Sequence, residues 1–258
     1  MVLAPHSWRP RPPRDCRFDR AGVAVNHHSA DEVAHQFESI RRRIDAVERP
    51  WTDAVEITAV TKAFAPTVVD TAVEAGCTVI GENYAQDLLS KRAAIECLVP
   101  HRRPRVDFIG HLQSNKVRQL VGLVDRWCTI DRSSIAKEIA NRAPGAEVLL
   151  QVNATGEENK GGCRPDDVAA LQRQCVELGL VVAGLLAIGP TGLPAEDAAP
   201  GFRLVRSLVD DLGLAVCSMG MTGDLDVAVA CGSTNVRIGS LLFGARPAPV
   251  HQEGDGRG

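Results

Sequence analysis

The hydrophobic pattern of the chain changes period many times between residues 55 and 238. Short runs rich in Val, Ile and other apolar residues, typical of buried parallel strands, alternate with segments whose apolar residues recur at helical spacing. The predicted strands are 55–61, 78–80, 106–109, 127–130, 148–152, 181–188, 215–217 and 234–238. The predicted helices are 66–75, 114–123, 133–142, 165–178, 198–212 and 225–230.

This alternation predicts an α/β fold, a single (β/α)8 TIM barrel. An open doubly wound sheet shows a similar alternation. However, the sequence contains neither GxGxxG nor GxxxxGK[ST], the phosphate-binding loops of nucleotide-binding sheets. We therefore expect one closed barrel, with its functional residues at the rim formed by the C-terminal ends of the strands.

An additional helix is predicted before the barrel. Ser29 is a good N-cap residue, acidic side chains follow it, and apolar residues then recur at helical spacing to about residue 48. We expect this helix to pack outside the barrel. Residues 1–28, with a Pro/Arg cluster at 9–14, are expected to be a disordered extension, 29–246 the barrel and 247–258 a flexible tail. A transit peptide and a mis-assigned start codon are both open for the first segment.

The composition of the chain indicates which kinds of molecule it can bind. The net charge of -3, with both signs interspersed, excludes the basic surface of a nucleic-acid binder or of a polybasic membrane-surface protein. The eight cysteines are scattered singly, which predicts buried free thiols and no metal site. No run is long enough to span a membrane, and no signal core is present. We expect a cytoplasmic protein that binds a small molecule.

Lys62 is the first candidate for chemistry, because it follows directly on the first predicted strand. That position places it at the rim, where desolvation keeps part of a lysine unprotonated and able to condense with a carbonyl. A solvated lysine at a strand end is the alternative. Position alone does not decide between them.

Other rim loops carry polar residues whose roles are open. Asn83 could hydrogen-bond a ring or its 3'-oxygen, or cap the following helix. His111 could titrate near neutral pH, or be an ordinary surface histidine. The polar loop at 153–162 could cover the barrel mouth, or be a solvated loop with weak ion pairs.

The loops after the last two strands predict a phosphate site. Glycines in 218–224 and 232–240 allow close approach of the backbone, the hydroxyls of Ser218 and Ser240 can donate, and a short helix is expected to begin after Gly239. Each loop alone could be a tight turn with a helix cap. Together they favour a bound phosphate.

Arg237 lies within the last apolar strand, where a guanidinium needs a partner. A buried ion pair is the usual partner. Alternatively, Arg237 donates to the pyridine nitrogen of a cofactor and keeps that nitrogen unprotonated, which makes the ring a poor electron sink.

Five motifs carry a resemblance to a known family: AVTK at 59–62, GENY at 81–84, FIGHLQSNK at 108–116, SMGM at 218–221 and GSTNVRIG at 232–239. From about residue 29 to 246, the chain resembles the pyridoxal phosphate homeostasis (PLP-binding) proteins. The resemblance implies a barrel like the N-terminal domain of alanine racemase, and pyridoxal 5'-phosphate (PLP) held as an internal aldimine. The residues it implies for cofactor binding are Lys62, Asn83, Ser218, Met219, Thr222, Arg237, Gly239 and Ser240.

The resemblance also implies a function. Members buffer or deliver PLP, with PLP-dependent apoenzymes as possible recipients, influence amino-acid and keto-acid balance, are usually monomeric and have no established catalysis. The sequence departs from the family pattern at Thr61 and Thr222, where Ser is common. The main alternative is a PLP-dependent amino-acid racemase, which needs a proton donor on each ring face, whereas Tyr84 is the one tyrosine of the chain. A cofactor-free interaction module would require Lys62, Arg237 and the Ser218 loop to be incidental.

Overall fold

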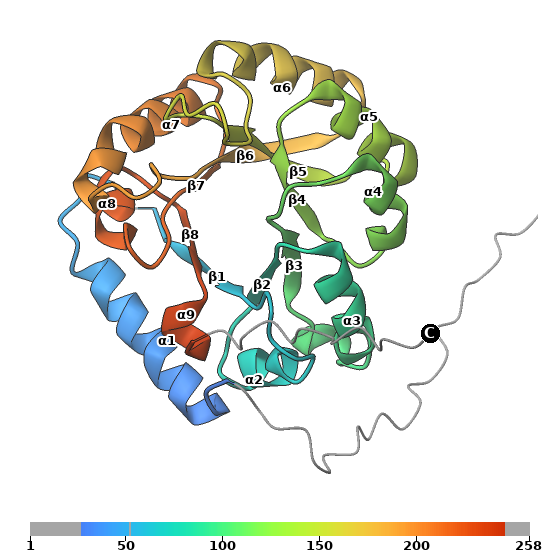
Figure 1. The fold of residues 1–258 in the computed structure, drawn as a ribbon, viewed down its shortest axis with the longest axis vertical. Coiled ribbons are helices and arrows are strands. Elements are labelled where there is room, and N and C mark those ends of the chain that lie inside the picture. The colour runs from blue at the N-terminus through green and yellow to red at the C-terminus, as the bar shows by residue number, and fades with distance from the viewer. Residues whose placement is uncertain (1–26, 52, 246–258) are drawn as a thin grey trace, which may run out of the picture.

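A closed barrel of eight parallel strands forms the centre of the computed structural model, which describes residues 27–51 and 53–245 (Figure 1). Each strand pairs with its neighbours in chain order, and the last pairs with the first. The strands are β1 Glu56–Val60, β2 Val79–Glu82, β3 Arg105–Phe108, β4 Arg126–Ile130, β5 Glu147–Val152, β6 Val181–Ala187, β7 Val216–Ser218 and β8 Asn235–Ile238. The predicted TIM barrel is confirmed, with every predicted strand within two residues of an observed one.

Helices form a ring outside the strands (Figure 1). They are α1 Ala30–Asp45, α2 Val68–Glu74, α3 Ala85–Glu96, α4 Ser114–Leu120, α5 Ser133–Arg142, α6 Val168–Glu177, α7 Ala199–Asp211, α8 Leu225–Ala230 and α9 Ser240–Phe243, with 3-10 turns η1 Pro100–Arg102, η2 Pro165–Asp167 and η3 Ala195–Ala198. The sequence pattern does not predict α3. The reason is that Lys91 occupies a buried position on its inner face, which interrupts the apolar period.

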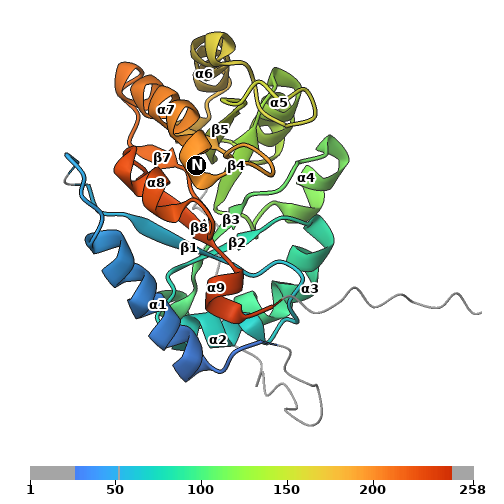
Figure 2. The ribbon, with the colours of Figure 1, turned by 60° about the vertical axis from the view of Figure 1, so that its left-hand side comes forward.

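The predicted N-terminal helix is present as α1, and it ends at Asp45 instead of near residue 48. Ser29 and Glu32 form a reciprocal capping box, as the sequence indicates for the N-cap. The helix packs beside α2, α8 and α9, outside the barrel (Figure 2). The predictions for residues 1–26 and 247–258 lie outside the described residues. His28 belongs to the described part, and its backbone N–H donates to the Phe243 carbonyl at 3.1 Å.

The apolar core has two layers. The larger one lies between the strands and the surrounding helices. A smaller cluster is formed by buried Cys128, Leu149 and Leu186, together with side chains packed against them: Ile109, Ala183, Ile188 and Val216. These residues come from β4 to β7 or from positions directly after β3 and β6, and the apolar filling of the barrel interior is therefore concentrated on that side.

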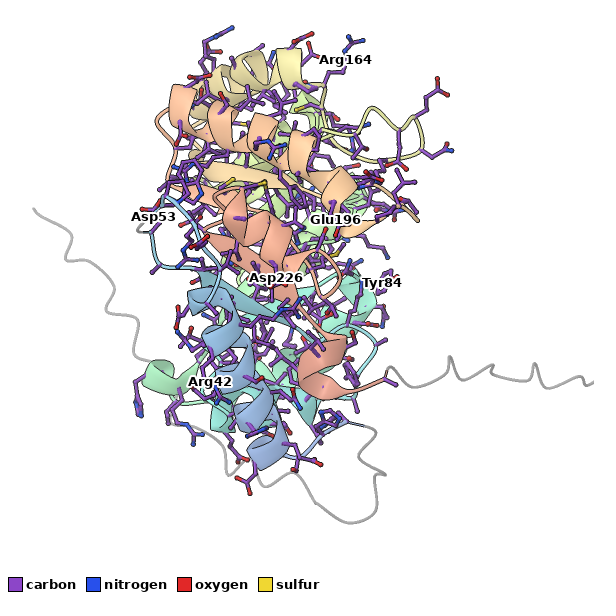
Figure 3. All side chains as sticks on the ribbon, turned by 90° about the vertical axis from the view of Figure 1, so that its left-hand side faces the viewer. Arg42, Asp53, Tyr84, Arg164, Glu196 and Asp226 are labelled. Carbon is purple, nitrogen blue, oxygen red and sulfur yellow. The ribbon has the colours of Figure 1, made fainter. Side chains whose placement is uncertain are left out.

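The two ends of the barrel can be recognised in Figure 3. Tyr84, after β2, and Glu196, after β6, lie towards one end, and Asp53, before β1, lies towards the other. The first end is formed by the C-terminal ends of the strands and is called the mouth below. The second end is called the base. Within the described ranges, no helix is long and apolar enough to cross a bilayer.

The cysteine prediction is correct in part. Cys77, Cys128, Cys163, Cys175, Cys217 and Cys231 are free, and all but Cys163 are buried. Cys97 is disulfide-bonded, so the expectation of free thiols throughout is wrong there. Scattered spacing does not reveal such a pair, because cysteines far apart in sequence can meet in the fold.

Candidate cofactor site

Lys62 follows β1 at the mouth and is half-buried. The next residue, Ala63, has a φ of 65°, and it is the one non-glycine residue in the described ranges with positive φ. A left-handed backbone is unfavourable for alanine and persists where the surroundings hold it. Here the Asp87 carboxylate of α3 accepts the Ala63 N–H at 2.8 Å. The turn that carries Lys62 is therefore fixed by a neighbouring helix.

A buried ion pair lies directly behind this turn. Lys91 Nζ is 2.7 Å from Glu82 Oε1, and both side chains are fully buried. The Thr61 hydroxyl donates to the same carboxylate oxygen at 2.6 Å, and Lys91 also donates to the Thr61 carbonyl at 3.1 Å. Burial raises the pKa of Glu82, against the lowering effect of Lys91. The sequence analysis missed this support of the Lys62 turn, because α3 was not predicted.

Asn83 follows β2 at the mouth. Its Oδ1 atom is buried and has no hydrogen-bond partner within the described part of the chain. A Cβ on Gly110 would lie 1.7 Å from the Asn83 carbonyl oxygen, so glycine is required where the loop after β3 crosses this residue. Because a buried amide oxygen is costly without a donor, it fits a site that a polar ligand completes. The alternative role as a helix cap is absent, since α3 begins after Tyr84 with no side-chain cap.

Arg237 is buried in β8 and reaches backbone carbonyls in place of a carboxylate. Its guanidinium donates to the carbonyl and hydroxyl of Ser218, both at 2.8 Å, and to the Ala187 carbonyl at 2.8 Å. Among the described residues Arg237 has carbonyl and hydroxyl partners and no ion pair, so the usual explanation of a buried arginine fails here. Burial lowers the pKa of Arg237 to about 10, which still leaves the side chain charged at neutral pH.

The loops after β7 and β8 place the other predicted residues. Met219 is fully buried, Thr222 is half-buried, and Ser240 is exposed at the start of α9. Gly239 lies against β1, where an added Cβ would be 3.2 Å from the Val60 carbonyl oxygen. The hydroxyl of Ser218 donates to Asn235 Oδ1 at 2.6 Å. The phosphate contacts of Ser218, Thr222, Gly239 and Ser240 stay predictions.

Strand pairing brings these residues to one side of the mouth. β8 pairs with β1 on one edge, with Ala59 opposite Ile238, and with β7 on the other, with Ser218 opposite Asn235. Lys62 therefore lies at the same edge as the loop that begins at Gly239. The fold therefore brings the turn that carries Lys62 beside the loop that begins at Gly239, as the cofactor hypothesis requires.

The polar loop at 153–162 is tied to the barrel. Gln151 donates to the Gly161 carbonyl at 2.9 Å, and Lys160 donates to the Gly189 carbonyl after β6 at 2.5 Å and pairs with Glu157. These contacts hold the loop beside the mouth. His111 is exposed beside this loop, where an added Cβ on Gly161 would lie 3.8 Å from its Nδ1 atom.

The fold and this site define a class: a TIM barrel whose mouth combines a lysine, an unsatisfied amide and an unpaired arginine to bind a small polar cofactor. Residues 29–247 match the family model "Alanine racemase, N-terminal domain". The pyridoxal phosphate homeostasis protein of Pseudomonas aeruginosa is 39% identical over 225 residues, covering 84% of this chain and 95% of the relative. The chain belongs to the pyridoxal phosphate homeostasis protein family.

Two further comparisons agree with this assignment. The homeostasis protein of Aquifex aeolicus is 36% identical over 230 residues, which cover 85% of this chain and 99% of the relative. The structure of PipY from Synechococcus elongatus PCC7942 with PLP bound has a TM-score of 0.71 at 28% identity, covering 82% of this chain and 100% of that one. The predicted family and fold are therefore confirmed.

Proposed function

We propose that this chain binds PLP covalently through Lys62 and serves PLP homeostasis by buffering or delivering the cofactor. The observation that carries the proposal is Arg237, a buried cation without a carboxylate, at the edge of the mouth that also holds Lys62. Such a cation is costly unless a ligand uses it. The relatives named for PLP homeostasis and the PLP-bound PipY structure support the choice of ligand.

The position of each residue at the mouth indicates which part of PLP it would contact. PLP supplies an aldehyde for attachment, an aromatic ring and a phosphate. The Lys62 amine would hold the aldehyde carbon covalently, with loss of one water, and the buried Glu82–Lys91 pair holds the turn behind it. Asn83 would contact the ring side of the ligand, Arg237 would donate to the ring nitrogen, and Thr222, Gly239 and Ser240 would hold the phosphate.

We further propose that the protein has no catalytic turnover, in contrast to a racemase. Arg237 is a permanent donor, so it keeps the ring nitrogen unprotonated and weakens the ring as an electron acceptor. The one tyrosine of the chain, Tyr84, is 59% exposed and points away from the barrel at the edge of the molecule (Figure 3). Two-base racemisation needs a proton donor on each face of the substrate, and Tyr84 is not placed as one. Cytoplasmic location, a monomeric state and hand-over to PLP-dependent apoenzymes are further parts of the proposal.

The first test is covalent trapping. The purified protein should be yellow with PLP, and borohydride reduction followed by peptide mass spectrometry should place the adduct on Lys62. Lys62→Ala should lose the adduct entirely, because it removes the amine that follows β1 at the mouth. Lys137→Ala, which removes an exposed lysine on α5, is the matched control and should keep it. An equal yield of adduct in the Lys62→Ala protein would refute the proposal.

A second test separates carrier from racemase. The PLP-loaded protein is incubated with single enantiomers of amino acids, and the opposite enantiomer is measured by chiral chromatography. We expect no turnover above that of free PLP. Turnover at rates ordinary for enzymes, about 1 per second or faster, would establish the racemase alternative.

A further inference from the structure

The Ser218 hydroxyl is turned into the barrel wall and already has two partners. It donates to Asn235 Oδ1 at 2.6 Å and accepts from Arg237 at 2.8 Å. The residue is 1% exposed. A serine hydroxyl has one proton to donate, so this proton is used inside the protein. An anion at the mouth would have to displace Asn235 to receive it.

Asn235 is itself held on its other side. Its Nδ2 group donates to the Thr58 hydroxyl at 2.9 Å and to Glu56 Oε2 at 3.1 Å. These two contacts fix which way the amide points, since Nδ2 must face the acceptors on β1 and Oδ1 must face Ser218. A continuous row of hydrogen bonds therefore joins β1, β8 and β7 and ends on the Arg237 guanidinium.

We propose that Ser218 and Asn235 are positioning residues for Arg237, and that Ser218 is not a phosphate ligand of this site. The inference rests on the proposed PLP-binding function and assigns a different role to one residue of it. In this arrangement Asn235 orients the Ser218 hydroxyl, and that hydroxyl together with the Ser218 carbonyl holds one terminal nitrogen of Arg237. The guanidinium is thereby aimed before the ligand arrives, which reduces the ordering that binding requires.

If Ser218 is a phosphate ligand, its loss should affect the binding of PLP and pyridoxal differently. If it positions Arg237, its loss should affect both alike. A phosphate ligand contributes to binding of PLP and contributes nothing to binding of pyridoxal, which lacks the phosphate. A residue that acts through Arg237 on the ring nitrogen contributes equally to both. The decisive quantity is therefore the ratio of the two dissociation constants, compared between wild type and variant.

The chain offers a matched control for removing a buried hydroxyl in this region. Ser233 is 4% exposed, and its hydroxyl contacts the carbonyls of Cys217, Met219 and Asn235 without reaching Arg237. Ser218→Ala and Ser233→Ala therefore lose a comparable buried hydroxyl. Only the first removes a contact of Arg237. Thr222→Val serves as the comparison for a predicted phosphate contact.

Dissociation constants for PLP and pyridoxal are measured by absorbance titration of the full chain. We expect Ser218→Ala to weaken both ligands by about the same factor, roughly tenfold, as for one lost hydrogen bond to a charged group. The visible absorption band of the bound ligand should shift in this variant, because the contact to the ring nitrogen changes. Ser233→Ala should leave affinities and band unchanged, and Thr222→Val should weaken PLP alone.

Weakening of PLP alone in Ser218→Ala, or no change for either ligand, would overturn the positioning role. If Ser218→Ala does not fold, Asn235→Ala tests the same row and should weaken both ligands equally. Failure of the proposed function gives a different result: wild type itself would form no Lys62 adduct. The Lys62 adduct in the wild-type protein is therefore measured first, and its absence would refute both proposals.

Discussion

Two buried arginines lie at opposite ends of the same barrel and have opposite surroundings. At the base, Arg126 is 2% exposed and pairs with Asp107, and Glu56 and Glu147 lie within 4 Å. At the mouth, Arg237 is 6% exposed and is held by two carbonyls and a hydroxyl. Both residues are buried, so the difference between them is in their partners.

The pKa of each arginine follows from its neighbours. Burial by itself lowers the pKa of Arg126, and Cys128 and Asp107 more than offset this, so the pKa lies above its usual range. Burial lowers the pKa of Arg237 to about 10, because the opposing effects of Cys128, Asp224 and Cys217 are smaller than that of burial. The buried Arg126 at the base is therefore ion-paired within the protein, whereas Arg237 at the mouth has no ion pair among the described residues, as the proposed ligand site requires.

The largest expected effect is at the base. Asp107→Ala removes the closest carboxylate of Arg126 and leaves a buried cation with weaker partners, so we expect a loss of about 3–5 kcal/mol in the free energy of unfolding. Urea unfolding of the PLP-free protein measures it. Asp226→Ala breaks the exposed pair with Arg43 and should cost less than about 1 kcal/mol. If Asp107→Ala lowers the free energy of unfolding no more than Asp226→Ala does, the buried ion pairs at the base do not stabilise the fold.

Arg237→Met should give the reverse pattern. The free energy of unfolding of the PLP-free protein should change by less than about 1 kcal/mol, because the substitution also removes an uncompensated buried charge. Affinity for PLP should fall by about 10- to 100-fold with loss of the contact to the ring nitrogen. Unfolding curves and absorbance titrations on the same samples give both values.

Arg206→Met is the control for this pair of measurements. Arg206 pairs with Asp210 outside the barrel, so its loss should leave PLP affinity unchanged. If Arg237→Met destabilises the protein by several kcal/mol and binds PLP normally, the two arginines have the same structural role and the contrast between mouth and base is wrong.

The smallest effect tests the connection between the two ends. Thr58 is fully buried, and its hydroxyl accepts from Asn235, which also contacts Glu56 of the base network. Thr58→Val should cost about 1 kcal/mol in the free energy of unfolding and weaken PLP only a few-fold, because Asn235 keeps Glu56 as an acceptor. The same two measurements apply. Unchanged stability would mean that the Thr58 hydroxyl contributes nothing to holding Asn235.

Much of the architecture follows from local pattern. The eight strands, the capped helix α1 and the position of Lys62 at a strand end are visible in the sequence, because side-chain periodicity and capping chemistry act over a few residues. The exception is α3, whose buried Lys91 resembles a surface residue until Glu82 is placed opposite it. That pair depends on how β2 and α3 pack, which no local pattern contains.

The sequence by itself determined that the chain forms an eight-stranded barrel, that Lys62 and Asn83 follow strands at its rim, and that Arg237 lies within the last strand. Tertiary structure alone decided what each polar group meets among the described residues: Arg237 donates to carbonyls instead of a carboxylate, the Asn83 side-chain oxygen has no partner, and the Ser218 hydroxyl donates to Asn235. The physical reason is range. Hydrophobic alternation involves residues that are close together in the sequence. Hydrogen-bond partners across a closed barrel come from strands that are many residues apart in the sequence.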